Sequence, residues 1–328
     1  MKQDAHLNEC NNVAVIMTCY NEGEYIVEAV RSVLDQTIAH IIQEIVIADD
    51  GSDPATIDVL KMLEGSDSRI RVVYGEGGRG LPAQRNIAIS TTTAPLLAIL
   101  DGDDIWAPNK LELQVAAIEA KGGTGLVYSD FFVFAEKDLS SARRAGVRDI
   151  SLADDLKLTY FVNDPPIIPS TILIRRTDYL ACGRFDDTVR VFEDTDFFLR
   201  MAGVCRFALV SQPLIYKRNR GASITGGRKD LMAHHAFVAF KAAAADPRLM
   251  ALVPRRLAER ARKLGNHRFL LGDVDGAVSL LGLSLRLHPL NHRTWPVYLG
   301  ARFFPKLSFR ALGRSGKQRR AALGGTQP

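Results

Sequence analysis

Hydrophobic and polar positions follow two different periods along the first half of the chain. Short, almost continuous apolar runs predict buried strands, and apolar residues three or four positions apart predict amphipathic helices. The predicted strands are 13–18, 44–49, 70–74, 95–100 and 125–134. The predicted helices between them are 24–35, 55–63, 82–90 and 109–120. Strands that alternate with helices in this way predict an α/β fold with a mainly parallel sheet between helices.

The second half of the chain is less regular. Residues 138–164 are charged and have no clear period, so we expect a loop with one short helix there. The elements predicted after this loop are strands at 171–175, 206–210 and 213–217 and a helix at 194–202. From about residue 226 the pattern is helical only, with predicted helices at 233–245, 255–264, 268–271 and 277–287. We therefore divide the chain into an α/β domain, residues 1–225, and an all-α C-terminal extension, residues 226–328.

Charge is distributed unevenly between these two regions. Residues 226–328 hold 19 Lys and Arg against 5 Asp and Glu, whereas residues 1–225 hold 23 against 32. Nine basic residues and no acidic residue follow Asp275, with aromatic and aliphatic residues among them. One hypothesis is that this basic tail lies on an anionic membrane surface. The alternative is a solvated basic helix that packs on the acidic domain. No motif predicts nucleic-acid binding.

Composition excludes several classes of protein. Hydrophobic residues make up 47% of the chain, which is enough for a substantial core. No apolar run approaches the roughly 20 residues of a membrane-spanning helix, and the first twelve residues lack the apolar segment of a secretory signal. We therefore expect a cytoplasmic protein, with its tail on the inner membrane face under the membrane hypothesis. The four cysteines form no CxxC pair and are expected to be reduced thiols.

Acidic side chains follow three of the predicted strands. The segments concerned are 18–22 (TCYNE), 49–52 (DDGS) and 101–104 (DGDD). In an open parallel sheet, ligands bind outside the carboxyl ends of the strands, so these segments are expected along one edge. Carboxylates gathered in this way repel each other unless a positive charge lies among them.

The Asp101–Asp104 segment is the most specific of the three. Two carboxylates that are two residues apart, just after an apolar strand, can face one divalent cation. Their hard oxygen ligands suit Mg²⁺ or Mn²⁺, which usually take one or two protein carboxylates and complete their shell with phosphate and water. The alternative is an acidic, glycine-containing loop that only caps the helix near Pro108.

Three further positions each allow two interpretations. Asp50 can accept hydrogen bonds from a nucleobase or ribose, or it can close its strand in an Asp-Gly turn. Arg85 can clamp a carboxylate or phosphate, or it can be a surface charge of its helix. Asp194, in the acidic cluster 193–196, can be a general base for an acceptor hydroxyl, or it can cap its helix. The choice for Asp194 depends on whether its loop faces the Asp101–Asp104 edge.

Taken in order, these segments resemble glycosyltransferase family 2 over roughly residues 13–225. The matching stretches are VAVIMTCYNEGEYIVEAVRSVLDQT, IVIADDGSDPAT, LPAQRNIAIS with LLAILDGDDIW, and CGRFDD with VFEDTDFFLRMA. The resemblance implies the Rossmann-like GT-A fold. It also implies an inverting transfer of a sugar from a nucleotide-diphosphate sugar to a hydroxyl of a saccharide or lipid-linked acceptor, in cell-surface polysaccharide or glycolipid synthesis.

The resemblance also implies a role for each matching residue. Asp194 would be the catalytic base, and Asp103 would coordinate Mn²⁺ or Mg²⁺. The residues implied for donor binding are Thr18, Tyr20, Glu22, Asp50, Arg85, Asp101 and Asp104. The family often has an Arg and a His after its last strand, but residues 217–223 (KRNRGAS) contain no His. Arg218 and Arg220 are therefore both candidates for contact with the diphosphate.

Two other functions are compatible with parts of the pattern. A non-catalytic nucleotide-sugar or polysaccharide-binding module is one alternative, but the presence of both acidic clusters favours a transferase. A nucleotidyltransferase is the other, and it would need a glycine-rich loop with a basic residue after the first strand. Residues 19–22 provide neither.

Overall fold

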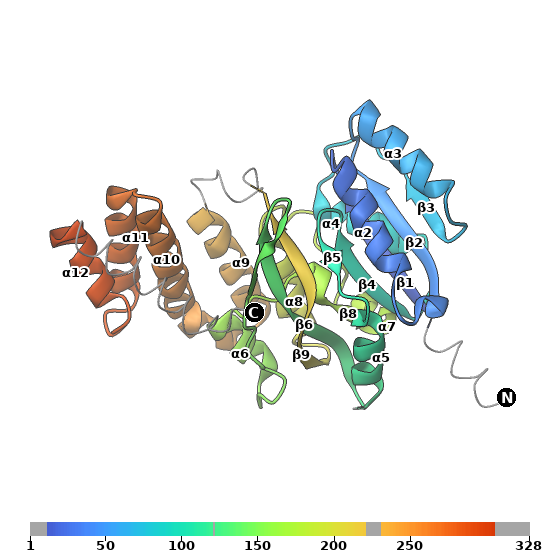
Figure 1. The fold of residues 1–328 in the computed structure, drawn as a ribbon. Helices are drawn as coiled ribbons and strands as arrows, with labels where there is room; N and C mark the ends of the chain where they lie inside the picture. The colour runs from blue at the N-terminus through green and yellow to red at the C-terminus, as the bar shows by residue number, and fades with distance from the viewer. Residues whose placement is uncertain (1–11, 121, 221–230, 306–328) are drawn as a thin grey trace, which may run out of the picture. The chain divides into compact units, whose positions relative to one another are not determined.

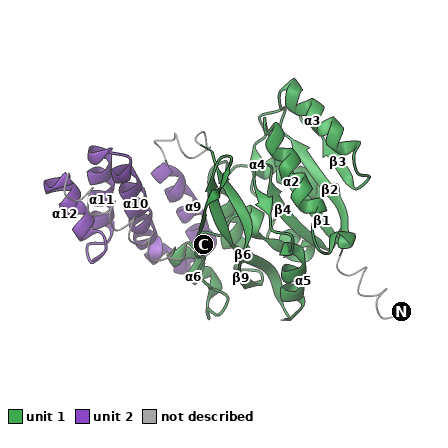
Figure 2. Cartoon of the chain, viewed as in Figure 1, with its two compact units in different colours: residues 1–229 green, residues 230–328 purple. Residues whose placement is uncertain are grey.

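The computed structural model describes residues 12–120, 122–220 and 231–305 (Figure 1). The chain divides into two compact units, residues 1–229 and 230–328 (Figure 2). The boundary expected from the sequence, between residues 225 and 226, lies outside the described residues. Across the described parts of the chain, no helix is both long enough and apolar enough to span a bilayer.

A single mixed sheet organises unit 1. Among the described residues its strand order is β3-β2-β1-β4-β8-β6-β9-β5, with β7 paired to β6 (Figure 1). The strands are β1 Val13–Cys19, β2 Ile42–Asp49, β3 Ile70–Val73, β4 Leu96–Asp101, β5 Ile105–Trp106, β6 Thr124–Ala135, β7 Asp138–Arg144, β8 Leu173–Arg175 and β9 Arg206–Asn219. The first four strands of this order pair in parallel, β8 is antiparallel to β4 and β6, and β9 is parallel to β6.

Helices cover the sheet because its central strands are apolar on both faces. All seven residues of β1 are buried. Ile26, Val30 and Val33 of one helix pack with alternate residues of β1 in one core cluster. The helices of unit 1 are α2 Glu24–Leu34, α3 Pro54–Glu64, α4 Leu81–Ser90, α5 Lys110–Ala120, α6 Leu156–Asn163, α7 Arg176–Ala181 and α8 Glu193–Met201, with 3₁₀ turns η1 Ala39–Ile41 and η2 Pro169–Thr171.

Two details of unit 1 differ from the sequence-based expectation. Residues 138–164 are not only a loop with a helix, because β7 pairs antiparallel with β6. This strand has exposed and half-exposed positions only, so it lacks the apolar alternation that reveals a strand in sequence. The strands predicted at 206–210 and 213–217 are one strand, β9, whose register against β6 shifts near Pro213.

Unit 2 is helical in its described part. Its elements are α9 Leu231–Ala245, η3 Pro247–Leu252, α10 Val253–Leu270, α11 Val274–Leu287 and α12 Trp295–Phe303. The helix predicted to stop at residue 264 instead continues as α10 through Gly265. A Cβ atom there would lie 2.9 Å from Cγ of Leu281, so the glycine lets α11 pack closely against α10. The last part of the basic tail, residues 306–328, lies outside the described residues.

Three of the four cysteines lie in the described residues. Cys19, Cys182 and Cys205 are free thiols, as expected. Cys10 lies outside the described residues. Burial raises the pKa of Cys182 to about 11, so this thiol stays protonated near neutral pH.

Candidate active site

The strand order brings two of the predicted site segments together. Residue pairing between β1 and β4 sets Thr18 beside Asp101, and pairing between β1 and β2 sets Cys19 beside Asp49. The loop after β4 passes very close to the loop after β1. A Cβ atom on Gly102 would lie 2.8 Å from the carbonyl oxygen of Thr18 and 3.1 Å from Cγ of Glu22, so only glycine fits here without a shift. The three acidic strand ends therefore share one edge of the sheet.

Glu22, Asp101 and Asp103 form the half-buried part of this acidic edge. Burial, and next the negative charge of Asp103, raise the pKa of Glu22 to about 7. Burial and the charge of Asp101 likewise raise the pKa of Asp103. Burial is the larger cause of these upward shifts, and repulsion between the carboxylates is the second; a positive charge at the edge relieves both. The edge therefore favours the arrival of a cation.

Asp104 belongs to the scaffold of the site. Its side chain is buried, and its Oδ2 accepts a hydrogen bond of 2.6 Å from the Ser170 hydroxyl. Its Oδ1 accepts a hydrogen bond of 3.0 Å from the backbone N–H of Arg218. Burial raises its pKa to about 7. Asp104 thus ties the loop after β4 to the η2 turn and to the end of β9.

Arg85 links the two acidic clusters. Its side chain is 1% exposed, so the interpretation as a surface charge is wrong. One guanidinium nitrogen lies 2.8 Å from Oδ1 of Asp101, and the other lies 2.9 Å from Oε1 of Glu193. The first carboxylate follows β4, and the second begins α8, more than ninety residues later. A single buried cation therefore fixes the spacing of the two clusters.

Asp194 lies next to this link at the start of α8. The residue before the helix, Phe192, has a left-handed backbone with φ 62°, which turns the chain sharply into the helix. Burial, and next the charge of Glu193, raise the pKa of Asp194 to about 7. The Thr195 N–H donates to its Oδ1 at 2.6 Å. A carboxylate with a pKa near neutral is well suited to accept a proton.

Lys217 is a site residue that the sequence pattern did not reveal. Burial lowers its pKa, but carboxylates of both clusters outweigh this and raise the pKa overall. The contributing carboxylates are those of Asp104, Asp101, Asp103 and Asp194. One ammonium group thus interacts with the loop after β4 and with the start of α8. Together with Arg85, it shows that the two acidic clusters line one site.

Asp50 holds a neighbouring loop in place. Its carboxylate accepts hydrogen bonds from the backbone N–H groups of Arg79 (3.0 Å) and Gly80 (2.9 Å). It also accepts one from Nε2 of Gln84 at 2.7 Å. The turn considered for Asp50 is instead formed by its neighbour Asp49. The Asp49 carboxylate accepts hydrogen bonds from the backbone N–H groups of Gly51 and Ser52.

The two other residues predicted for donor binding differ in exposure. Thr18 is buried within the end of β1, whereas Tyr20 is 59% exposed. An exposed aromatic ring at the carboxyl edge of a sheet provides a surface on which a planar base can stack. The Tyr20 ring is therefore accessible to a ligand, whereas the Thr18 side chain is not.

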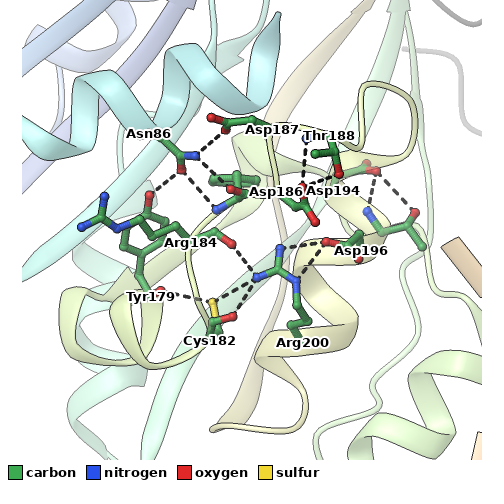
Figure 3. Close-up of polar contacts among 12 residues, drawn as sticks. Asn86, Tyr179, Cys182, Arg184, Asp186, Asp187, Thr188, Asp194, Asp196 and Arg200 are labelled. Atoms are coloured by element: carbon green, nitrogen blue, oxygen red, sulfur yellow. Dashed lines mark hydrogen bonds and ion pairs between the residues drawn. The ribbon is translucent and has the colours of Figure 1, made fainter. Parts of the chain in front are cut away.

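The segment 182–188 is tied to both α4 and α8. Asn86, next to Arg85 on α4, accepts from the Phe185 N–H (3.1 Å) and donates to Oδ1 of Asp187 (2.7 Å). Arg200 of α8 donates to the carbonyl oxygens of Cys182 (2.8 Å) and Arg184 (2.5 Å). Figure 3 shows that these two side chains, one from α4 and one from α8, both contact the segment. Adjacent residues of the Arg-Asn pair thus serve different parts of the site.

The two arginines after β9 have different environments. Arg218 has a side chain that is 3% exposed and packs over the rings of Tyr25 and Phe134, with its carbon Cζ 4.6 Å from each centroid. Arg220 is 31% exposed, and its Nε lies 2.9 Å from Oδ2 of Asp103. Both guanidinium groups lie over the Tyr25 ring, and that of Arg220 is the more exposed of the two.

The acidic edge fits a divalent cation that is shared with a ligand. In residues 12–120, 122–220 and 231–305, no group of three or more Asp, Glu, His or Cys side chains could hold a metal ion by itself. The oxygen donors of Asp103, Asp101 and Glu22 nevertheless have the chemistry that Mg²⁺ and Mn²⁺ prefer. Such ions need only one or two protein carboxylates when phosphate oxygens complete the shell.

Comparison with known proteins decides the family. Residues 14–180 match the family described as Glycosyl transferase family 2. The chain belongs to glycosyltransferase family 2. It is 43% identical over 103 residues to a putative teichuronic acid biosynthesis glycosyltransferase, TuaG, of Bacillus subtilis, and covers 40% of that protein. It is 37% identical over 119 residues to the Escherichia coli UDP-Glc:alpha-D-GlcNAc-diphosphoundecaprenol beta-1,3-glucosyltransferase WfgD, and covers 45% of it.

These matches are partial on both sides. They cover 31% and 36% of this family 2 chain, which spans less than half the length of either relative. Among solved structures, S. aureus TarS 1-349 in complex with UDP-GlcNAc is similar with a TM-score of 0.62 and 17% identity, covering 94% of this chain and 92% of that one. At this identity the likeness shows the fold alone, and it confirms the predicted GT-A class with a helical C-terminal region.

Proposed function

We propose that this family 2 protein transfers a sugar from a nucleoside-diphosphate sugar to a hydroxyl group of an acceptor, with inversion at the anomeric carbon. The observation that carries the proposal is the placement of Arg85, which joins Asp101 to Glu193, the residue before Asp194. Lys217 interacts with carboxylates of both clusters. A single displacement needs a base that can take the proton of the acceptor hydroxyl, and a carboxylate with a pKa near 7 suits this role. The acidic edge is the proposed site of the donor.

In the proposed reaction, the acceptor oxygen attacks the anomeric carbon while the bond from that carbon to the donor phosphate oxygen breaks. Asp194 takes the proton of the attacking hydroxyl. Arg220 and Lys217 provide positive charge near the departing diphosphate. Asp103, with Asp101 and Glu22 beside it, would hold Mn²⁺ or Mg²⁺, which when bound supplies further charge neutralisation to the leaving group. Tyr20 and the loop fixed by Asp50 would border the nucleoside.

The named activities of the relatives support the substrate class. TuaG is named for teichuronic acid biosynthesis, and the named substrates of WfgD are UDP-Glc and a diphosphoundecaprenol-linked sugar. We therefore propose that the protein acts in cell-surface polysaccharide or glycolipid synthesis in the cytoplasm. Its proposed acceptor is a saccharide or a lipid-linked saccharide, and UDP-sugars are the first donors to test.

The decisive experiment measures nucleoside diphosphate release from a panel of nucleotide sugars with Mn²⁺ and a set of saccharide acceptors. Asp194→Asn should keep donor binding but lower turnover by about 10²- to 10⁴-fold, the contribution of a positioned base. Asp103→Asn should weaken donor binding. Asp58→Asn, on the exposed surface of α3, is the matched control. Full turnover by Asp194→Asn would exclude it as the base, and donor binding without any transfer would favour a binding module.

A second proposal concerns the tail of unit 2. Trp295, Leu299 and Phe303 are four positions apart on α12, so they share one helix face, and they are 44%, 44% and 64% exposed. Arg302 lies in the same helix, and residues 306–328 add six basic residues without an acid. We propose that this face docks on an anionic membrane surface, because apolar insertion combined with basic charge is what such surfaces bind.

Flotation with vesicles tests the membrane proposal. The full chain should float with phosphatidylglycerol vesicles and much less with phosphatidylcholine vesicles. Changing Trp295, Leu299 and Phe303 together to Ser should weaken binding by roughly tenfold or more for each side chain that inserts, since each buried apolar side chain contributes about 1.5–3 kcal/mol. Leu152→Ser, at a site 82% exposed in unit 1, is the control. Equal flotation of the triple variant and the control would rule out this docking face.

A further inference from the structure

Arg220 neutralises two acidic groups that come from different strand ends. Two of its guanidinium nitrogens face both oxygens of Glu22, at 2.8 Å and 3.1 Å. Its Nε lies 2.9 Å from Oδ2 of Asp103. Glu22 follows β1 and Asp103 follows β4, whereas Arg220 follows β9. The guanidinium group of Arg220 therefore links the ends of three strands at the acidic edge.

The ion pair with Asp103 involves the carboxylate that the proposed reaction needs for a divalent cation. A carboxylate oxygen that is already paired with a guanidinium attracts a metal ion less, because the two positive charges repel each other. Glu22 and Asp103 are paired with the same guanidinium and also repel each other, so positive charge between them is favourable. Without a ligand, Arg220 supplies that charge.

A diphosphate is the ligand that can draw Arg220 away from Asp103. The planar guanidinium group matches the oxygens of a phosphate as well as those of a carboxylate. The side chain is 31% exposed, whereas Arg218 is enclosed by aromatic rings and cannot exchange its partners without leaving them. Lys217 also interacts with carboxylates of both clusters, so it adds positive charge at the same edge.

We propose that Arg220 is an internal counter-ion that exchanges Asp103 for the donor diphosphate, so that the divalent cation and the nucleotide bind tightly only together. This inference rests on the proposed function. It adds a coupling between two ligands, which by thermodynamic reciprocity strengthens the binding of each by the same factor. It also assigns to Arg220, and not to Arg218, the contact with the diphosphate.

Calorimetric titration tests the exchange without measuring turnover. Mn²⁺ alone should bind Arg220→Ala about tenfold more tightly than the unchanged protein, because Asp103 loses its competitor. UDP without metal should bind the variant about tenfold more weakly. The factor by which Mn²⁺ improves UDP binding should shrink in the variant. Arg220→Lys keeps the charge but cannot contact both acids with the same geometry. Its Mn²⁺ affinity should therefore lie between that of the unchanged protein and that of Arg220→Ala.

Two controls separate the possible outcomes. Arg190→Ala removes an exposed guanidinium that donates to the Gly78 carbonyl, and it should leave Mn²⁺ affinity unchanged. Asp103→Asn combined with Arg220→Ala should abolish the gain in Mn²⁺ affinity. Equal Mn²⁺ affinity in Arg220→Ala and the unchanged protein, or no Mn²⁺ binding in either, would overturn the exchange. If the unchanged protein does not bind UDP at all, the result counts against the proposed function instead. The titration with Mn²⁺ alone does not depend on the nucleotide, so it still tests the exchange.

Discussion

The two sides of the site are held by different kinds of interaction. On the proposed donor side, the loop after β4 is packed against β1 at Gly102, and Arg220 and Lys217 interact with its carboxylates. On the proposed acceptor side, segment 182–188 is fixed by hydrogen bonds with Asn86 and Arg200, mostly through backbone groups. The proposed donor side therefore depends on ion pairs at a partly exposed surface, whereas the proposed acceptor side depends on hydrogen bonds to the backbone.

Arg85 is the residue that joins the two sides, so its replacement should have the largest effect. Arg85→Met leaves Asp101 and Glu193 without their buried partner and should lower the free energy of unfolding by about 3–5 kcal/mol. Arg85→Lys should recover only part of this loss, because an ammonium group cannot fork between two carboxylates.

Urea denaturation measures the effect of the Arg85 variants. The control is Arg71→Met, which removes a half-exposed arginine paired with Glu44 and should cost about 0–1 kcal/mol. A similar decrease in the free energy of unfolding for both variants would mean that the buried Arg85 ion pairs stabilise the fold no more than a surface ion pair does.

The acceptor side should control the pH dependence of turnover. Asp194 must be ionised to accept a proton, and burial raises its pKa to about 7. The turnover number at saturating donor should therefore fall as the pH drops below about 7, by about tenfold per pH unit. The pH profile of Asp194→Asn should lack this limb in its residual activity. If the limb persists in that variant, the titrating group lies on the donor side, where burial also raises the pKa of Glu22 and Asp104 to about 7.

Replacing Asn86 should give a smaller effect that is confined to the acceptor side. Asn86→Ala removes the hydrogen bonds to Phe185 and Asp187, each of which contributes about 0.5–1.5 kcal/mol. The KM for the acceptor should rise about tenfold, and UDP affinity should stay the same. Steady-state kinetics with the acceptor varied, together with UDP titration, separates the two. Weaker UDP binding in Asn86→Ala would show that the two sides are not independent.

The hydrophobic pattern predicted most of the framework because buried parallel strands are continuous apolar runs. It also placed the acidic strand ends on one edge, since the carboxyl ends of neighbouring parallel strands must meet. It missed β7, whose polar residues have no buried face to produce a period. It also placed the end of α10 too early, because the contact between Gly265 and Leu281 is visible only once two helices pack.

The roles of single charged residues were harder to predict. Lys217 follows an apolar stretch and precedes two arginines, and no local pattern separates it from them. Its position among four carboxylates arises from the pairing of β9 with β6, which joins residues about eighty positions apart. Likewise, the burial of Arg85 results from the meeting of two loops that the sequence separates widely. Long-range pairing therefore determines which cations belong to the site.

The forked contact of Arg85 has a consequence for redesign. Exchanging the stretch around α8 for that of a relative, in order to change the acceptor, also exchanges one of the two carboxylates that this guanidinium holds. A chimaera that brings in a residue other than Glu at position 193 would disturb the nucleotide half as well. We therefore expect a change of acceptor preference to succeed only when α4 and α8 are exchanged together, so that residue 85 keeps its partner at position 193.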